Sequence, residues 1–294
     1  MCKRENQHNE KKISIKYVFS NREFGEKKGS DNFIKFVKKN KIEMITFSSK
    51  EYKSQKQSHW KELRNSFDEV VLSKISRYKT DIIIAAGYML FSPVICNHFK
   101  ILNLHPALPN GPNGTWKNVI KSLILSQSKS SGISIHLMTP DLDDGPNISF
   151  CEFHIKNKRN IGLWEKINEQ YEDIETSTLF FEIRKKIISH EKALLKKTLE
   201  KISNGEIDIN KNNLVDLSKE VSQSAKAKAI DEVSKDLADT EKEKFEKMAE
   251  NVEYDSADKF REKLETIKES YFPKSKIEET ASKDEVDSVA ANAP

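Results

Sequence analysis

Short apolar runs of strand length recur along the first half of the chain. They occupy residues 13–19, 42–47, 81–86, 100–104, 133–138 and 148–155. Runs of this kind, rich in β-branched residues and bounded by turn residues, are typical of β-strands. Residues 82–86 are apolar at every position. This predicts a central parallel strand that is covered by helices on both faces.

Helical patterns lie between these runs. We expect one helix to begin after Ser30, a favourable N-cap residue, and to place Phe33, Phe36 and Val37 on one face. Two more helices are predicted at 59–78 and 115–129. Strands that alternate with helices are typical of an open α/β sheet. The fold prediction is therefore α/β, with an open and mostly parallel sheet.

The pattern changes after residue 155. Residues 175–203 predict one long helix, and its apolar stripe comprises Phe180, Phe181, Ile183, Ile187, Leu194, Leu195 and Leu199. A polar segment at 207–213 follows, and after it only helical patterns occur. We predict four segments: a disordered N-terminus at 1–12, an α/β domain at 13–210, an all-α tail at 211–272 and a disordered C-terminus at 273–294.

The charge of the chain changes near the same place. Residues 215–294 carry 14 basic and 21 acidic side chains, whereas the whole chain has a formal net charge of +4. The tail is therefore acidic and the preceding part basic, as expected of separate units. A basic domain could favour an anionic ligand, but a lysine-rich solvated surface is the simpler explanation.

Several classes of protein and site do not fit the sequence. The three cysteines, Cys2, Cys96 and Cys151, show no metal-site or disulfide spacing. The polar N-terminus is not a secretory signal, and no apolar run is long enough to span a bilayer. No phosphate-binding glycine motif follows a strand, and the basic stretches lack interleaved aromatic residues. We expect a soluble, cytoplasmic protein with no metal, no membrane partner and no nucleic-acid partner.

Asn103 and His105 are the first candidate site residues. They lie two positions apart in the run Lys-Ile-Leu-Asn-Leu-His-Pro, so a strand would point both side chains to one face. Pro106 ends the strand. The two polar side chains are therefore expected at its carboxyl end, where open α/β sheets bind ligands.

A run of aspartates supplies the third candidate group. The strand that ends near Met138 leads into a turn that contains Asp141, Asp143 and Asp144, and we expect this turn at the same sheet edge. An amide, an imidazole and a carboxylate together suit acyl transfer to an amine, because they can stabilise an oxyanion and relay a proton. Each residue alone also fits a plain role as a strand-end cap, a surface histidine or a turn residue.

The motifs resemble those of formyltransferases of the glycinamide ribonucleotide formyltransferase superfamily. The matching segments are Ala-Ala-Gly-Tyr-Met, Leu-Asn-Leu-His-Pro-Ala-Leu-Pro, Ser-Gly-Ile-Ser-Ile-His-Leu and Leu-Asp-Asp-Gly-Pro, which occur in the order seen in that family. The resemblance implies a Rossmann-like domain over residues 13–205 and a catalytic trio of Asn103, His105 and Asp143. It also implies 10-formyltetrahydrofolate as cofactor, with the pterin near Met89, Leu90, Phe91, Val94, Thr139, Pro140, Asp141 and Leu142.

Two departures from that family pattern are expected. Residues 17–21 resemble the second strand of the family, so its first strand and glycine-rich phosphate turn are expected to be missing. The segment Gly-Tyr-Met-Leu-Phe-Ser-Pro is also one residue shorter than its counterpart. Binding of the pterin is compatible with both departures, whereas tight binding of glycinamide ribonucleotide is less so.

The tail has a resemblance of its own. Residues 215–272 resemble the C-terminal part of prohead core scaffolding proteins of tailed phages, which implies self-association through the C-terminal helices, or else they form a generic helical appendage. If the chain is phage-encoded, it would act in the host cytoplasm. The leading expectation is formyl transfer from 10-formyltetrahydrofolate to a small-molecule amine, such as glycinamide ribonucleotide in de novo purine synthesis. The alternatives are hydrolysis of the same cofactor, or a phage assembly protein with an inactive formyltransferase-like domain.

Overall fold

The computed structural model describes residues 13–88, 90, 92–140, 145–158, 160–168, 173–252, 254 and 257–273. These residues fall into two compact units, which divide between Ser224 and Ala225. The division lies inside a helix, beyond the polar segment at 207–213 where the sequence suggested a boundary. Each unit has its own hydrophobic core.

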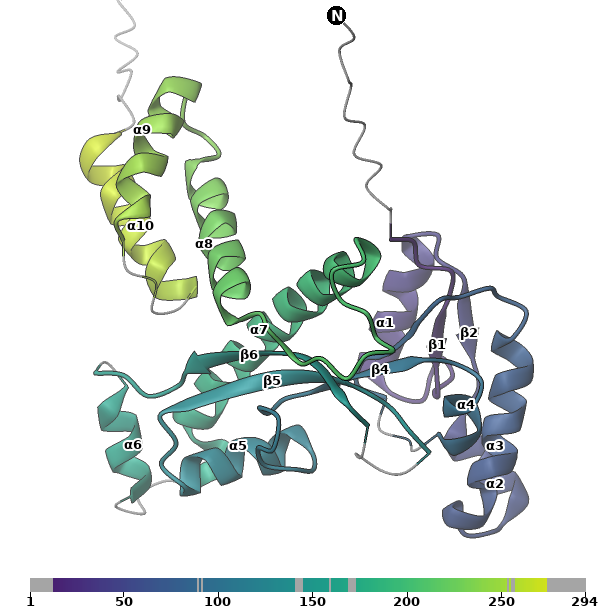
Figure 1. The fold of residues 1–294 in the computed structure, drawn as a ribbon. Coiled ribbons are helices and arrows are strands. Elements are labelled where there is room, and N and C mark those ends of the chain that lie inside the picture. Colours follow the sequence, from purple (N-terminus) through teal and green to yellow (C-terminus); the bar gives the residue numbers. More distant parts are fainter. Residues whose placement is uncertain are drawn as a thin grey trace, which may run out of the picture. The chain divides into compact units, whose positions relative to one another are not determined.

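The first unit is an α/β structure with seven strands in its described residues (Figure 1). Its strands are β1 (Val18–Ser20), β2 (Met44–Thr46), β3 (Ile83–Ala85), β4 (Ile101–His105), β5 (Ser130–Leu137), β6 (Asn147–His154) and β7 (Val215–Asp216). Its helices are α1 (Lys28–Lys39), α2 (Ser49–Lys56), α3 (Trp60–Ile75), α4 (Pro93–Cys96), α5 (Trp116–Leu125), α6 (Ile161–Asn168), the short 3₁₀ turn η1 (Ile174–Thr176), α7 (Thr178–Ser203) and the start of α8 (Ser218–Ser234).

The strands form two sheets, β1-β2 and β3-β4-β5-β6-β7. Parallel pairs join β1 to β2, β3 to β4 and β6 to β7, which confirms the predicted α/β fold with mostly parallel pairing. The remaining two pairs are antiparallel, because β5 runs opposite to both of its neighbours, β4 and β6. In Figure 1, β5 and β6 lie side by side with α7 along them.

The larger sheet has apolar side chains on both faces. On one face, Leu102 of β4 and Ile133 and Ile135 of β5 pack with α5 and α7. On the other, Ala85 of β3 and Ile101 of β4 share a core with the aromatic side chains of α2 and α3. The predicted strand at 82–86 packs into both cores, through Ile82 and Ile84 on one side and Ala85 on the other, as its uninterrupted apolar run indicated. Its predicted central position was wrong, because β3 stands at the end of the strand order of its sheet.

Each of the six predicted strands is present, but the first is shorter than expected. Residues 13–17 belong to no strand, and Ile13 and Ile15 are 50% and 65% exposed. Their alternating pattern favours a strand, yet β1 begins to pair with β2 only at Val18. A strand pattern forms a strand only where a neighbouring backbone offers hydrogen bonds.

Two details of the helix predictions were wrong. The first helix begins at Lys28, so Ser30 lies within it and is not its N-cap. It buries Ile34 and Val37, whereas Phe33 and Phe36 are 47% and 63% exposed. Ile34 and Val37 are three positions apart, and the face centred on them packs inward and turns the phenylalanines outward.

The predicted long helix is present as α7, and its stripe is largely as expected. Phe180, Ile183, Ile187 and Leu194 are buried, but Phe181 is 53% exposed. Ser177 caps the helix by accepting a hydrogen bond from the Phe180 amide at 3.2 Å. Gly205 follows its end with a φ of 79°, a left-handed conformation that suits a helix stop.

The second unit comprises the rest of α8, α9 (Asp239–Glu250) and α10 (Ala257–Tyr271). Its core contains Ala229, Val233, Phe245, Ala249, Phe260 and Leu264. The Lys268 ammonium donates to the Val233 carbonyl at 2.7 Å and so ties α10 to α8. In the described part of this unit, all secondary structure is helical. The all-α tail was predicted to begin at residue 211, however, and that was wrong, because Val215–Asp216 forms β7 beside β6.

Residues 187–224 pack as part of the first unit. Leu194, Leu217 and Val221 are part of its core, and the Leu217 amide donates to the Phe150 carbonyl of β6 at 2.8 Å. The Thr198 hydroxyl is hydrogen bonded to that of Ser149 at 2.8 Å. The sheet unit therefore extends to about residue 224.

We predict that a variant ending at Ser224 folds cooperatively, whereas one ending at Lys186 does not. The shorter variant loses β7 and several buried side chains, and each large apolar side chain removed from a core destabilises by about 2–5 kcal/mol. Thermal unfolding followed by circular dichroism checks this. Cooperative unfolding of the shorter variant at the temperature of the longer one would contradict it.

His190 of α7 is buried against the sheet and makes stability depend on pH. Its ring stacks on Phe153 with centroids 4.0 Å apart, and its Nδ1–H donates to the Lys186 carbonyl at 2.8 Å. Burial lowers the pKa of His190 to about 4. As the pH falls from about 6.5 towards 4, His190 binds a proton in the unfolded chain but not in the folded protein.

The free energy of unfolding is therefore expected to fall across that range by up to about 3 kcal/mol through His190. Chemical denaturation at pH 7 and pH 4.5 measures the loss. The variant His190→Phe keeps the stacking and lacks the titrating group, so its loss should be smaller. Equal losses in the two proteins would show that His190 is not responsible.

Candidate active site

Strand β4 presents Asn103 and His105 on one face, as the two-residue spacing predicts. Leu102 and Leu104 point to the opposite face, into the core formed with α5 and α7. Pro106 directly follows the strand. Asn103 and His105 are both half-buried, so they are reachable from solvent yet held by their surroundings.

Strand β5 adds His136 to this face, a residue that the sequence argument missed. Asn103 lies directly opposite His136 in the antiparallel register, and its Nδ2 donates to His136 Nε2 at 3.3 Å. Nε2 is then the unprotonated nitrogen of a neutral imidazole. The available signal was strand alternation, which places His136 on the face of β5 opposite Ile133 and Ile135.

His105 is held by the loop that follows its own strand. Its Nε2–H donates to the Pro112 carbonyl at 3.1 Å, and its ring centroid is 6.3 Å from that of His136. The loop is shaped by a turn in which the Gly111 amide donates to the Leu108 carbonyl at 2.8 Å. Asn110 has a φ of 64°, as the third residue of a type II turn requires.

Gly132 of β5 lets this loop lie directly on the sheet. A Cβ at position 132 would be 2.2 Å from Leu108 Cδ2 and 2.6 Å from the Cys151 carbonyl oxygen. Any larger residue would displace Leu108 and with it the loop that positions His105. A glycine inside a strand is the sequence signal for such a close approach.

Several predicted site residues lie outside the described residues. They are Met89, Phe91, Asp141, Leu142 and Asp143, together with the neighbouring Asp144. The structure therefore does not test whether Asp143 joins Asn103 and His105.

The argument that placed the aspartate turn at the carboxyl end of β4 was wrong. It assumed parallel neighbours, but β4 and β5 are antiparallel. The Met138 amide donates to the Ile101 carbonyl at 2.8 Å, so the turn after β5 starts beside the amino end of β4. Thr139 lies three residues beyond His136, or about 10 Å along a strand.

The described parts of the predicted pterin-binding set come from two segments. Leu90 and Met138 pack in the same hydrophobic cluster, which brings the segment before α4 to the end of β5. Val94 and Thr139 are half-buried and Pro140 is exposed. Gly145 closes the aspartate turn with no room for a side chain, because a Cβ there would lie 1.6 Å from the Leu137 carbonyl oxygen.

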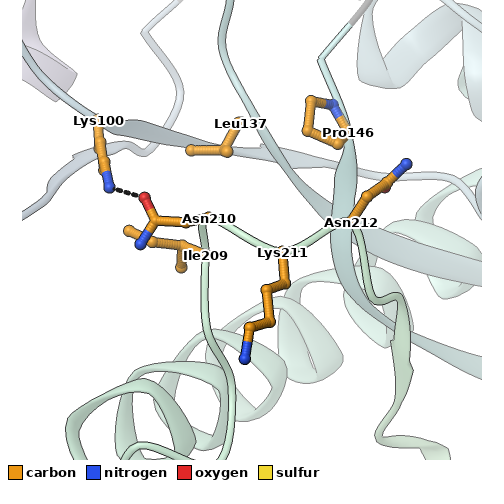
Figure 2. A pocket seen from close by; sticks show the side chains of 7 residues that line it. All are labelled: Lys100, Leu137, Pro146, Ile209, Asn210, Lys211 and Asn212. Atoms are coloured by element: carbon orange, nitrogen blue, oxygen red, sulfur yellow. Dashed lines mark hydrogen bonds between the residues drawn. The ribbon is translucent and has the colours of Figure 1, made fainter.

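A hollow of about 560 Å³ in the first unit lies apart from Asn103 and His105. Its lining comprises Lys100, Leu137, Pro146, Ile209, Asn210, Lys211 and Asn212. Lys100 reaches Asn210 across it, and the Lys211 side chain points away from Leu137 (Figure 2). The lysines and asparagines of this lining are exposed, so the hollow offers no buried polar side chain for a ligand.

The described residues contain neither a metal site nor a membrane-spanning helix. No group of three His, Cys, Asp or Glu side chains there is arranged to hold a metal ion. None of the helices there is long and apolar enough to cross a membrane.

Two family models match the chain. The model described as formyl transferase matches residues 4–180, and the model of the T4-phage like capsid assembly scaffolding protein family matches residues 187–293. The two matches meet within α7, which runs from Thr178 to Ser203.

Individual relatives agree with the first match. The phosphoribosylglycinamide formyltransferase of Escherichia coli (strain K12) is 30% identical over 88 residues, which cover 29% of this chain and 41% of that protein. The matched part thus spans about two fifths of that relative's length.

Several solved structures are similar to the chain. The phosphoribosylglycinamide formyltransferase of Campylobacter jejuni has 24% identity and a TM-score of 0.45, covering 63% of this chain and 79% of that one. A formyltetrahydrofolate deformylase of Pseudomonas syringae pv. tomato has 18% identity and a TM-score of 0.46, covering 68% and 55%. Because the formyl transferase model matches more than half of its residues, the chain belongs to the formyl transferase family.

Proposed function

We propose that the first unit transfers a formyl group from 10-formyltetrahydrofolate to the amine of a small molecule, with glycinamide ribonucleotide as the first acceptor to test. The observation that carries this proposal is the pair Asn103 and His105 on one face of β4, each already oriented by a hydrogen bond to the protein. Family membership and the relatives that act on glycinamide ribonucleotide support it.

The hydrogen bonds leave each side chain one group for the substrate. The Asn103 amide has two N–H donors, and His136 uses one of them. The His105 ring uses Nε2 for the Pro112 carbonyl, which leaves Nδ1 free of that contact. One amide N–H and one imidazole nitrogen are therefore available for the formyl group.

These groups fit the charge changes of acyl transfer. The amine attacks the formyl carbon, negative charge grows on the formyl oxygen, and the amine must lose a proton. Asn103 and a protonated His105 can donate to that oxygen, and one such donor contributes about 3–4 kcal/mol to lowering the barrier. A carboxylate nearby, proposed to be Asp143, would favour the charged imidazole and accept the proton.

The cofactor itself would supply the formyl group, and the described residues fit the binding of its ring system. Leu90 and Met138 both pack against the core that β3 and β4 share with α3, and Thr139, directly after Met138, is half-buried. Flat ring systems bind in sites that combine apolar side chains with a few polar groups.

We predict that His105→Ala and Asp143→Asn each lower turnover by at least roughly a hundredfold, because each removes a group that moves a proton or stabilises charge. The assay follows the absorbance of a stable 10-formyl folate analogue with glycinamide ribonucleotide present. His154→Ala is the matched control, since His154 lies on β6 and is exposed. Near-normal activity of either site variant would disprove the assigned roles, and consumption of the analogue without any amine would indicate hydrolysis instead.

A second function is favoured for the tail by the scaffold-family match at residues 187–293. We propose that the helices of the second unit mediate self-association of the chain. The part of this match beyond residue 224 forms a helical unit with its own core, so it can act without altering the sheet unit.

This second proposal predicts that the full chain forms an oligomer and that the variant ending at Ser224 forms a monomer or an oligomer of fewer chains. Light scattering after size-exclusion chromatography measures both masses. Monomers in both cases, or the same oligomer in both, would contradict a role of the second unit in assembly. If the full chain forms an oligomer but has no formyltransferase activity, the protein is better explained as an assembly protein with an inactive formyltransferase domain.

A further inference from the structure

A buried ion pair on α3 lies beside the segment that precedes α4. Arg64 and Asp68 are one helical turn apart, and their side chains are 7% and 0% exposed. Arg64 Nη2 contacts Asp68 Oδ1 and also donates to the Ser92 hydroxyl at 2.7 Å. Three side chains from two separate segments are thus joined through one guanidinium.

Helix α4 depends on this contact because it lacks a cap of its own. Ser92 occupies the N-cap position, yet its hydroxyl makes no capping hydrogen bond. It accepts instead from Arg64 and donates to the Leu90 carbonyl at 3.4 Å. The first N–H groups of a helix need an acceptor or a negative charge nearby.

Asp68 supplies that negative charge from the neighbouring helix. Burial raises the pKa of Asp68, and the charge of Arg64 together with the backbone N–H groups of Val94 and Ile95 acts in the opposite direction. These two amides belong to the first turn of α4. The carboxylate therefore stabilises the start of α4 by electrostatics.

The pair is a poor choice for stability alone. Both side chains are withdrawn from water, and burial is the largest influence on the pKa of Asp68. Buried ion pairs are often no better for stability than apolar side chains of the same volume. Such pairs contribute specificity, because their hydrogen bonds form in only one arrangement of the segments that they join.

We propose that Arg64, Asp68 and Ser92 form a clamp that fixes the start of α4 and the position of Leu90, and that these three are positioning residues for folate binding. The consequence for folate rests on the function proposed above, whereas the fixing of α4 does not. The clamp touches Leu90 through its carbonyl, and Leu90 packs in the cluster that contains Met138 at the end of β5.

Cys96 offers a direct readout of the clamp. It is the last residue of α4 and is half-buried, and burial, aided by the Asp68 charge, raises the pKa of its thiol to about 11. A loosened α4 would expose this thiol. Cys151 is buried, and peptide mass spectrometry separates labelling of Cys96 from labelling of Cys151 and of the third cysteine, Cys2.

The test uses the full chain with Ser92→Ala and Asp68→Asn, and with Ser73→Ala and Glu69→Gln as controls on exposed positions of α3. We expect labelling of Cys96 by a maleimide at pH 7 to become at least about fivefold faster in both clamp variants. The KM for the formyl donor should rise roughly tenfold, the effect of one hydrogen bond to a charged group, with kcat within about threefold. The controls should match the wild type.

Ser92→Ala removes no charge, so it tests the clamp even if Asp68→Asn fails to fold. Unchanged Cys96 labelling in Ser92→Ala would overturn the clamp. Faster labelling with an unchanged KM would overturn its role in folate binding. Faster labelling in a protein whose wild type never turns over the donor would confirm the clamp on α4 and overturn the proposed function.

Discussion

The antiparallel pairing of β4 with β5 is the constraint on which the candidate site depends. It sets Asn103 opposite His136 and His105 opposite Ser134, and it turns Leu102 and Leu104 into the core. A slip of one residue would send the polar side chains to the apolar face and the leucines to the site. Burial of apolar groups on one face therefore enforces the orientation of the polar groups on the other, and the loop over Gly132 then holds His105 in place.

The sheet that carries the site is completed by residues outside the formyl transferase match. That match ends at residue 180, within the first turn of α7, but the core continues through Leu194, Leu217 and Val221. The scaffold-family match begins at residue 187, within the same helix. A segment that resembles an assembly protein thus contributes both a strand and core side chains to the unit that carries Asn103 and His105. The two family likenesses are joined in one packed structure up to residue 224 and separate only beyond it.

Local features of the fold could be predicted from sequence, because they depend on neighbouring residues. The uninterrupted apolar run of β3, the alternation around Asn103 and the glycine that ends α7 each reflect local physics. The direction of β5 could not be predicted in this way. A helix separates β4 from β5, as in a parallel crossover, and only the pairing with β6 and the core side chains decide the antiparallel arrangement. For that reason the start of the segment after β5 was expected at the carboxyl end of β4, whereas it lies beside the amino end.

The same distinction applies to side chains. Phe33 and Phe36 have the spacing of a buried face, but Ile34 and Val37 are the side chains of α1 that are buried. His136 is identified as a site residue only by its pairing with Asn103 on the neighbouring strand.

Whether folate binds at all is the question on which the account rests, and calorimetric titration of the purified full chain with a 10-formyl folate analogue answers it most directly. Folate binding by the first unit predicts a saturable heat with a dissociation constant of about 1–100 μM, a free energy of roughly −5 to −8 kcal/mol. No measurable heat of binding, with a folded protein in the cell, would contradict the assignment of Asn103 and His105 to formyl transfer.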